Sequence, residues 1–82
     1  MNVRVLYFAV ARELCGVSEE AIDLPDEVRT VARLATHLEA LHPGLRGRLS
    51  SMRFARNEEF ASAADPIADG DVVALIPPVA GG

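Results

Sequence analysis

Two stretches decide the fold: Val3-Arg4-Val5-Leu6-Tyr7-Phe8 near the N-terminus, and Val72-Val73-Ala74-Leu75-Ile76 near the C-terminus. Both are rich in β-branched and aromatic residues, which predicts strands. Successive side chains of a strand point to opposite faces, so the first stretch has Val, Val and Tyr on one face and Arg, Leu and Phe on the other. Apolar residues therefore occur on both faces of the predicted strand.

The segment after the first strand contains a short helix and a second strand. Ala11–Leu14 is expected to form at most a short helix, ended by Gly16, which can adopt the left-handed conformation that commonly stops a helix. A second strand is expected over about residues 17–24, ended by Pro25-Asp26.

One amphipathic helix is expected from Thr30, a good N-cap, to about His42, where Pro43-Gly44 ends it. Its apolar residues recur at three- and four-residue spacing, which is the pattern of a helix with one buried face. These residues are Val31, Leu34, Ala35, Leu38 and Leu41.

Two modest strands are expected after the helix, at Met52–Arg56 and around Phe60, joined at Asn57-Glu58-Glu59. Asp69-Gly70-Asp71 then predicts a turn that leads into the last strand, which Pro77 ends because proline has no N–H to give a sheet.

The order strand, strand, helix, strand, strand, strand permits an α+β fold of the ubiquitin-like β-grasp type. In that arrangement a single main helix packs on one face of a mixed sheet of about five strands, and the closing strand pairs beside the first. We expect a β-grasp domain over residues 1–77 and a flexible C-terminal Gly-Gly tail over residues 78–82.

One helix covers only one side of such a sheet. Leu6 and Phe8 of the first strand, with Ala74 and Ile76 of the last, are then expected on the uncovered side. The favoured interpretation is an exposed apolar patch that contacts a partner protein. The alternative is that loop residues 43–66 fold over this face and bury it within the monomer.

Composition narrows the class of protein. The 82 residues have a net charge of −4, with eight arginines and no lysine, which argues against a nucleic-acid partner and favours a basic protein partner over an acidic one. No apolar run approaches the ~20 residues of a membrane span, so no membrane partner is expected and we expect a cytoplasmic protein. The single Cys15 cannot form an internal disulfide, and no Cys/His spacing predicts a metal site.

The C-terminal Pro78-Val79-Ala80-Gly81-Gly82 carries the most specific chemistry. Five extended residues reach about 17 Å, at ~3.4 Å each, so the terminal carboxylate can enter a partner while the body stays outside. Glycine suits a narrow channel because it has no Cβ. The domain offers no nucleophile paired with a base, so we interpret the Gly82 carboxylate as the reactive group.

The motifs VLYFAVARELCG, the helix end LHP, the Arg-Asn turn and, most specifically, DGDVVALIPPVAGG resemble the MoaD family, the small, sulfur-carrying subunits of molybdopterin synthase. The resemblance spans the whole chain. It implies a protein that is not catalytic alone and that binds no cofactor, because ATP and Mg²⁺ are used by an activating enzyme.

The resemblance implies a cycle with three encounters. An adenylating enzyme related to the ubiquitin-activating enzymes converts the Gly82 carboxylate into an acyl-adenylate, and a sulfurtransferase or other persulfide donor replaces AMP to leave a thiocarboxylate. The tail then enters the large (catalytic), MoaE-like subunit and gives its sulfur to cyclic pyranopterin monophosphate during molybdenum cofactor biosynthesis. A heterotetramer of two small and two large subunits is the family expectation.

The same resemblance places Phe8, Phe60 and Ile76 where the family makes hydrophobic contact with the large subunit, although the last position is often aromatic. The approach to the terminus, Pro77, Pro78 and Val79, is expected to contact the partner as well.

Two alternatives stay open on the residues alone. One is a sulfur carrier for another pathway, such as the thiazole of thiamin, a thiolated tRNA base or cysteine. The other is a ubiquitin-like protein modifier whose adenylate is attacked by a lysine amine. Without lysine, no isopeptide-linked chain can grow on the domain itself.

Three further residues receive structural interpretations. Cys15 is expected to act as a small, buried hydrophobic residue. His37 and His42 are expected to be solvent-exposed or to cap the helix, without a catalytic role.

Overall fold

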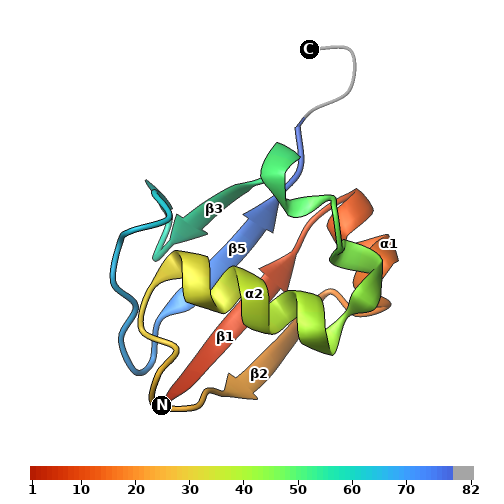
Figure 1. The fold of residues 1–82 in the computed structure, drawn as a ribbon. Coiled ribbons are helices and arrows are strands. Elements are labelled where there is room, and N and C mark those ends of the chain that lie inside the picture. The colour runs from red at the N-terminus through yellow and green to blue at the C-terminus, as the bar shows by residue number, and fades with distance from the viewer. Residues whose placement is uncertain (79–82) are drawn as a thin grey trace.

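The two decisive stretches form β1 (Asn2–Tyr7) and β5 (Val72–Ile76), which lie side by side and parallel at the centre of a five-stranded sheet (Figure 1). The structure is a computed structural model that describes residues 1–78. The other elements are α1 (Val10–Cys15), β2 (Glu19–Asp23), α2 (Val31–Leu41), the 3-10 turns η1 (Pro43–Leu45) and η2 (Leu49–Ser51), β3 (Arg53–Arg56) and β4 (Glu59–Ala61).

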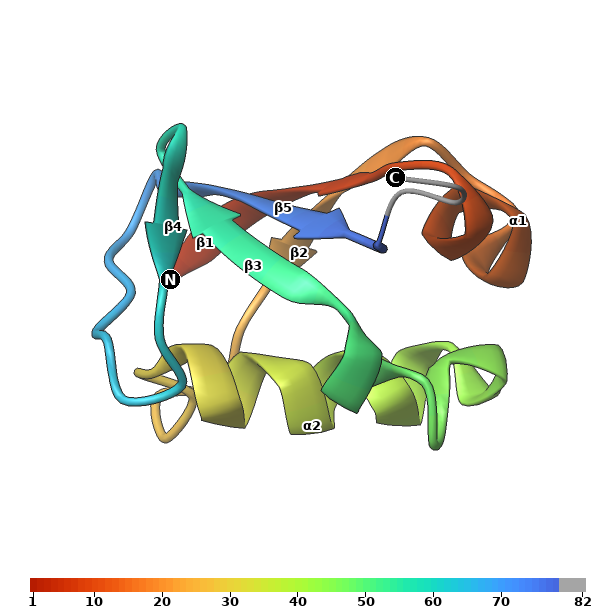
Figure 2. The same ribbon diagram turned by 90° about the horizontal axis from the view of Figure 1, so that it is seen from above.

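The strand order is β2-β1-β5-β3-β4, and every pairing except β1 with β5 is antiparallel. The sheet is therefore mixed, and α2 crosses one of its faces (Figure 2). This architecture confirms the predicted β-grasp fold. The second strand is shorter than expected, because Val17 and Ser18 form the bend that follows left-handed Gly16.

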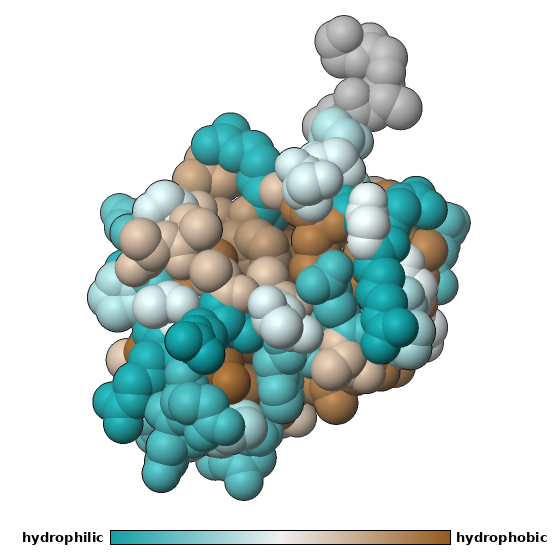
Figure 3. All heavy atoms as spheres, in the orientation of Figure 1, coloured by the Kyte–Doolittle hydropathy of each residue, from teal (hydrophilic) through white to brown (hydrophobic). Residues whose placement is uncertain are grey.

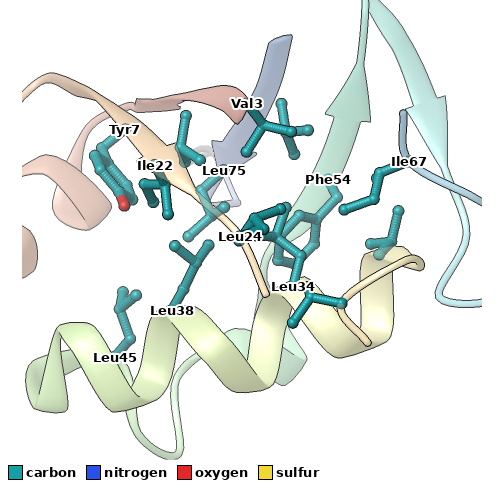
Figure 4. Packing of buried hydrophobic residues seen from close by; sticks show 14 of the residues in the cluster. Val3, Tyr7, Ile22, Leu24, Leu34, Leu38, Leu45, Phe54, Ile67 and Leu75 are labelled. Carbon is teal, nitrogen blue, oxygen red and sulfur yellow. The ribbon is translucent and has the colours of Figure 1, made fainter. Parts of the chain in front are cut away.

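α2 begins at the predicted cap: the Thr30 hydroxyl accepts a hydrogen bond from the Arg33 backbone N–H at 3.2 Å. Val31, Leu34 and Leu38 are buried, as their spacing predicts. The prediction that Leu41 belongs to the buried face is wrong, since it is 47% exposed. Its place at that end of the core is taken by Leu45 of η1, which is fully buried and lies beyond Leu38 (Figure 4).

The core occupies the space between α2 and the inner face of the sheet (Figure 4). Val5, Val73 and Leu75 have no exposed surface, and Tyr7 and Val3 are each 2% exposed. Burying such side chains contributes about 1.5–3 kcal/mol each. The inner face of β1 and β5 therefore contributes substantially to the fold's stability.

The sharp turns lie where the sequence predicts them. Gly70 (φ 86°) makes the turn before β5, and Asn57 and Glu58 adopt positive φ in the β3–β4 hairpin. The Asn57 side chain accepts from the Val72 N–H and donates to Asp71, both at 3.0 Å, so it joins this hairpin to the start of β5. The position of β4 is thereby tied to the centre of the sheet.

Candidate functional site

The sheet face opposite α2 is apolar across four strands. Register places Leu6, Ala74, Ala55 and Phe60 in one row, from β1 through β5 and β3 to β4. Phe8 and Ile76 lie on one side of this row and Val72 on the other. Together these residues line an open hollow of about 260 Å³, whose border also includes Glu58. We call these seven apolar residues the outer face.

The outer face is open to solvent. Phe60 is 59% exposed, Phe8 48% and Val72 37%. No helix or strand of residues 1–78 lies over it (Figure 2). The alternative that residues 43–66 cover this face is wrong, because η1 packs between α1 and α2 and the segment after β4 pairs with the entry to α2. Such an exposed apolar surface usually marks a protein contact.

The two faces of the molecule differ in character. Seen from the α2 side, an open hollow between the helix and β3 is lined mainly by apolar residues, and hydrophilic side chains cover much of the rest of this face (Figure 3). Much of the hollow's lining consists of small alanines. That hollow lacks exposed aromatic side chains, whereas the outer face has two. The outer face is therefore the stronger candidate for a docking surface.

The tail begins at one border of the outer face. Pro77 is buried and Pro78 exposed, and together with Phe8, Ile76 and Arg48 they line an open hollow of about 740 Å³. Pairing of β1 with β5 continues as far as the Phe8 N–H, which donates to the Leu75 carbonyl at 3.3 Å. The approach to the terminus is thus held against the exposed Phe8 and Ile76.

The structure brings together the predicted contact residues Phe8, Phe60 and Ile76 on one continuous surface, with Pro77 and Pro78 at its border. Their role in partner binding stays a prediction. The remaining predicted site residues, Val79, Gly81 and Gly82, lie outside the described residues.

A polar cluster of Tyr7, Glu20 and His42 lies on the α2 side of the sheet, at one end of the core. Glu20 Oε2 accepts a hydrogen bond from the Tyr7 hydroxyl at 2.6 Å and lies 2.5 Å from His42 Nε2. The His42 side chain is only 17% exposed, and its ring stands edge-on to that of Tyr7, with centroids 5.6 Å apart. His42 caps the end of α2, as one of its two interpretations expected, and its backbone N–H donates to the Leu38 carbonyl. The other interpretation, solvent exposure, is wrong, because Glu20 and Tyr7 hold the ring against the core.

Burial and the bond to Glu20 raise the pKa of Tyr7, so its hydroxyl remains a donor. Burial acts to raise the pKa of Glu20, but the hydrogen bonds from Tyr7 and His42 outweigh it and hold that pKa below its usual range. Burial, with a smaller contribution from Glu20, raises the pKa of Cys15 to about 11. A protonated thiol is a poor nucleophile. Cys15 packs against the core as expected, but it is only partly buried.

Within residues 1–78, no group of three or more His, Cys, Asp or Glu side chains is arranged to hold a metal ion. No helix in this part of the chain is long and apolar enough to cross a membrane. The described residues therefore offer a contact surface as their candidate site.

Sequence reasoning missed some of the outer face and the whole polar cluster. Ala55 and Val72 belong to the outer face, but the order of β3 and β4 in the sheet follows from long-range pairing that local patterns do not reveal. Glu20 could have been found, because it shares the inward parity of the buried Ile22 in β2. An acidic residue at an inward position needs a partner.

Comparison with known proteins assigns the family. The family model described as the ThiS family matches residues 5–82. The molybdopterin synthase sulfur carrier subunit of Chlamydomonas reinhardtii is 43% identical, with 100% of each chain covered. That of Homo sapiens is 37% identical, over 99% of this chain and 94% of its own.

Solved structures agree. A putative molybdopterin converting factor, subunit 1, from Pyrococcus furiosus superposes with a TM-score of 0.86 at 33% identity, covering 96% of this chain and 99% of its own. Small archaeal modifier protein 1 of H. volcanii has a TM-score of 0.84 at 28% identity, covering 95% and 98%. One chain of a complex of subunits 1 and 2 of the molybdopterin-converting factor from Helicobacter pylori superposes with a TM-score of 0.72 at 28% identity, covering 100% of this chain and 100% of its own. The chain belongs to the ThiS family, among the molybdopterin synthase sulfur carrier subunits.

Proposed function

We propose that this chain is the sulfur carrier subunit of molybdopterin synthase, with Gly82 as the residue that holds the sulfur. The observation that carries the proposal is the geometry of β5. Its inner residues, Val73 and Leu75, are fully buried, while Ala74 and Ile76 belong to the outer face. The chain then leaves β5 and continues through Pro77 and Pro78 toward the terminus.

This geometry links docking to delivery. A partner seated on the outer face lies next to the start of residues 78–82, which we interpret as a tail separate from the β-grasp domain. Five extended residues span about 17 Å, at ~3.4 Å each. The terminal carboxylate can thus reach a site inside the partner that the globular body does not enter.

The chemistry requires activation, because a carboxylate is a poor electrophile. In the proposed cycle an adenylating enzyme joins the Gly82 carboxylate to the α-phosphate of ATP, with Mg²⁺ on the nucleotide, and releases pyrophosphate. The terminal sulfur of a donor persulfide attacks the carbonyl carbon and AMP leaves. A thiol then reduces the resulting acyl disulfide to the thiocarboxylate, whose sulfur anion is a strong nucleophile. The nucleotide and metal ligands belong to the enzyme, and this chain supplies the acyl group.

The proposed acceptor is the large, catalytic subunit of molybdopterin synthase. A solved complex of subunits 1 and 2 of the H. pylori factor supports a partner of that kind. There the thiocarboxylate would give its sulfur to cyclic pyranopterin monophosphate. We further propose that two small and two large subunits assemble, and that the cycle runs in the cytoplasm, where ATP is present and Cys15 stays reduced.

Intact-mass measurement tests this function. The chain is incubated with the adenylating enzyme, ATP, Mg²⁺ and a persulfide donor, and we expect one oxygen to be exchanged for sulfur. A variant that lacks Gly82 should show no exchange and an unchanged melting temperature, because a terminal residue contributes little to stability. An unchanged mass of the full chain with a competent enzyme would refute the sulfur-carrier function.

A protein modifier is the second candidate, because small archaeal modifier protein 1 has the same fold. Adding the large subunit and the pterin precursor to the sulfur-loaded chain separates the candidates. The proposed function requires molybdopterin to form. A modifier would instead appear in covalent, isopeptide-linked conjugates with lysines of other proteins. A carrier for thiamin, tRNA or cysteine would be loaded with sulfur but give no molybdopterin.

A further inference from the structure

The acidic net charge of the chain is distributed unevenly. Four of the eight arginines lie within residues 46–56, and no Asp or Glu occurs between Glu39 and Glu58. β3 and β5 are antiparallel, and the register pairs Arg53 with Ile76 and Arg56 with Val73. The start of β3 therefore lies at the tail end of the sheet, where the local charge is positive.

Arg53 lies at the edge of the outer face, beside the predicted contact residue Phe60, and also lines the hollow between α2 and β3. Its guanidinium carbon is 3.7 Å from the ring centroid of Phe60, a cation–π contact that orients the side chain across the exposed ring. The register places Ile76 on its other side. A partner that covers Phe60 therefore also covers Arg53.

Arg48 lies on the other side of Ile76, next to Pro77 and Pro78 where the tail begins. It precedes η2 and lines the hollow formed with Phe8, Ile76, Pro77 and Pro78. Arg48 and Arg53 thus flank Ile76, one toward the tail and one toward β4.

Neither cation is neutralised by the described part of the chain. The ion pairs of residues 1–78 involve the N-terminus, Arg4 and His42. Arg4 of β1, which lies beside the start of β5, forms an ion pair with Glu19 at 2.7 Å. The Arg56 side chain donates a hydrogen bond to the Pro66 carbonyl. Arg4 and Arg56 are thus engaged within the domain, whereas no ion pair or side-chain hydrogen bond within residues 1–78 holds the guanidinium of Arg48 or Arg53.

An arginine that is buried in an interface loses its hydration, and without a counter-charge nothing compensates for that loss. We propose that the surface of the large subunit that packs on Ile76 presents carboxylates to Arg48 and Arg53, and that these charge pairs orient the docked carrier so that its tail faces the site. The inference rests on the proposed function. It also reverses, at the tail end, the expectation of a basic partner drawn from net charge.

The test uses binding of the full chain to the purified large subunit, measured by titration calorimetry over a series of salt concentrations. Affinity of the unmodified chain should fall as salt rises. Arg53→Glu and Arg48→Glu should each weaken binding at least about tenfold, because they place a like charge against the partner's carboxylates. Arg53→Gln should weaken binding less and should flatten the salt dependence.

Arg33→Glu is the matched control. It makes the same change of charge on the α2 side, where Arg33 lines a hollow with Thr36 and His37. Its affinity and salt dependence should equal those of the unmodified chain. Melting temperatures of all variants should agree within a few degrees, since these side chains are exposed.

The outcomes separate this inference from the function it rests on. Failure of the unmodified chain to bind the large subunit would refute the proposed function. Normal binding that Arg48→Glu and Arg53→Glu leave unchanged would refute only the charge pairing. Loss of sulfur loading by the adenylating enzyme, with unchanged affinity for the large subunit, would assign the two cations to the other partner and overturn the inference.

Discussion

The two faces of one sheet are built from similar residues and serve different purposes. On the inner face, Val5, Val73 and Leu75 are completely buried beneath α2. On the outer face, Phe8 is 48% exposed and Phe60 59% exposed. The difference follows from topology, because one helix can cover only one side. Apolar residues on the inner face stabilise the domain, and those on the outer face are available to a partner.

The largest expected effect is on the inner face. Leu75→Ala should lower the free energy of unfolding by about 2–5 kcal/mol, because the cavity beneath α2 cannot collapse fully. Urea denaturation measures the change. The neighbouring Ile76→Ala, which truncates a half-buried side chain on the other face of the same strand, is the matched comparison and should cost markedly less. Equal losses from the two variants would show that the outer face is also part of the core.

The outer face should show the reverse pattern. Phe8→Asp should change the free energy of unfolding by about 0.5 kcal/mol or less. It should weaken large-subunit binding by about 2 kcal/mol or more, since exposed aromatic residues are typical anchors of an interface. Calorimetric titration and thermal melts measure both quantities. A strongly destabilised Phe8→Asp chain would contradict the assignment.

Leu41 offers a control for that experiment. It is 47% exposed, close to the 48% of Phe8, but it lies at the end of α2 on the other side of the molecule. Leu41→Asp introduces the same carboxylate at similar exposure. Large-subunit affinity should be unchanged in this variant.

The sequence predicted the two faces because strand parity is a local property. The alternation in residues 3–8 and 72–76 was enough to divide core from outer face, and Thr30 was enough to place the start of α2. Leu41 was misplaced because the helix ends there and η1 supplies Leu45 instead.

What was missed depends on contacts between distant elements. The neighbour of Phe60 is Arg53 only because β4 folds back on β3, and β3 on β5. The partners of Glu20 come from β1 and the end of α2, 13 and 22 residues away in sequence. No periodicity in one segment specifies such a meeting.

A smaller effect concerns the polar end of the inner face. Tyr7→Phe keeps the ring in the core but removes the hydroxyl that donates to Glu20. The free energy of unfolding should fall by about 1 kcal/mol, as expected for one lost hydrogen bond. Phe8→Tyr adds a hydroxyl on the outer face and should leave stability unchanged. Identical stability of Tyr7→Phe and the unmodified chain would show that the bond contributes nothing.

The smallest expected effect is a pH dependence. The folded state holds the pKa of Glu20 below the usual value of 4.5. The unfolded chain therefore binds the proton more readily, and the stabilising contribution of Glu20, fully present above its unfolded pKa, is lost as pH falls through its folded pKa. Unfolding measured in acid should show this loss, and Glu20→Gln should show a shallower one. The same acid dependence in Glu20→Gln would place the effect on other carboxylates.

Methyl NMR during titration with the large subunit tests the central claim most directly, because it compares the two faces residue by residue. The account predicts that the methyl signals of Leu6, Val72 and Ile76 shift or broaden on binding, while those of the buried Val73 and Leu75 on the same strand change little. Perturbation confined to α2 and its surroundings, with the outer-face methyl groups unchanged, would contradict it.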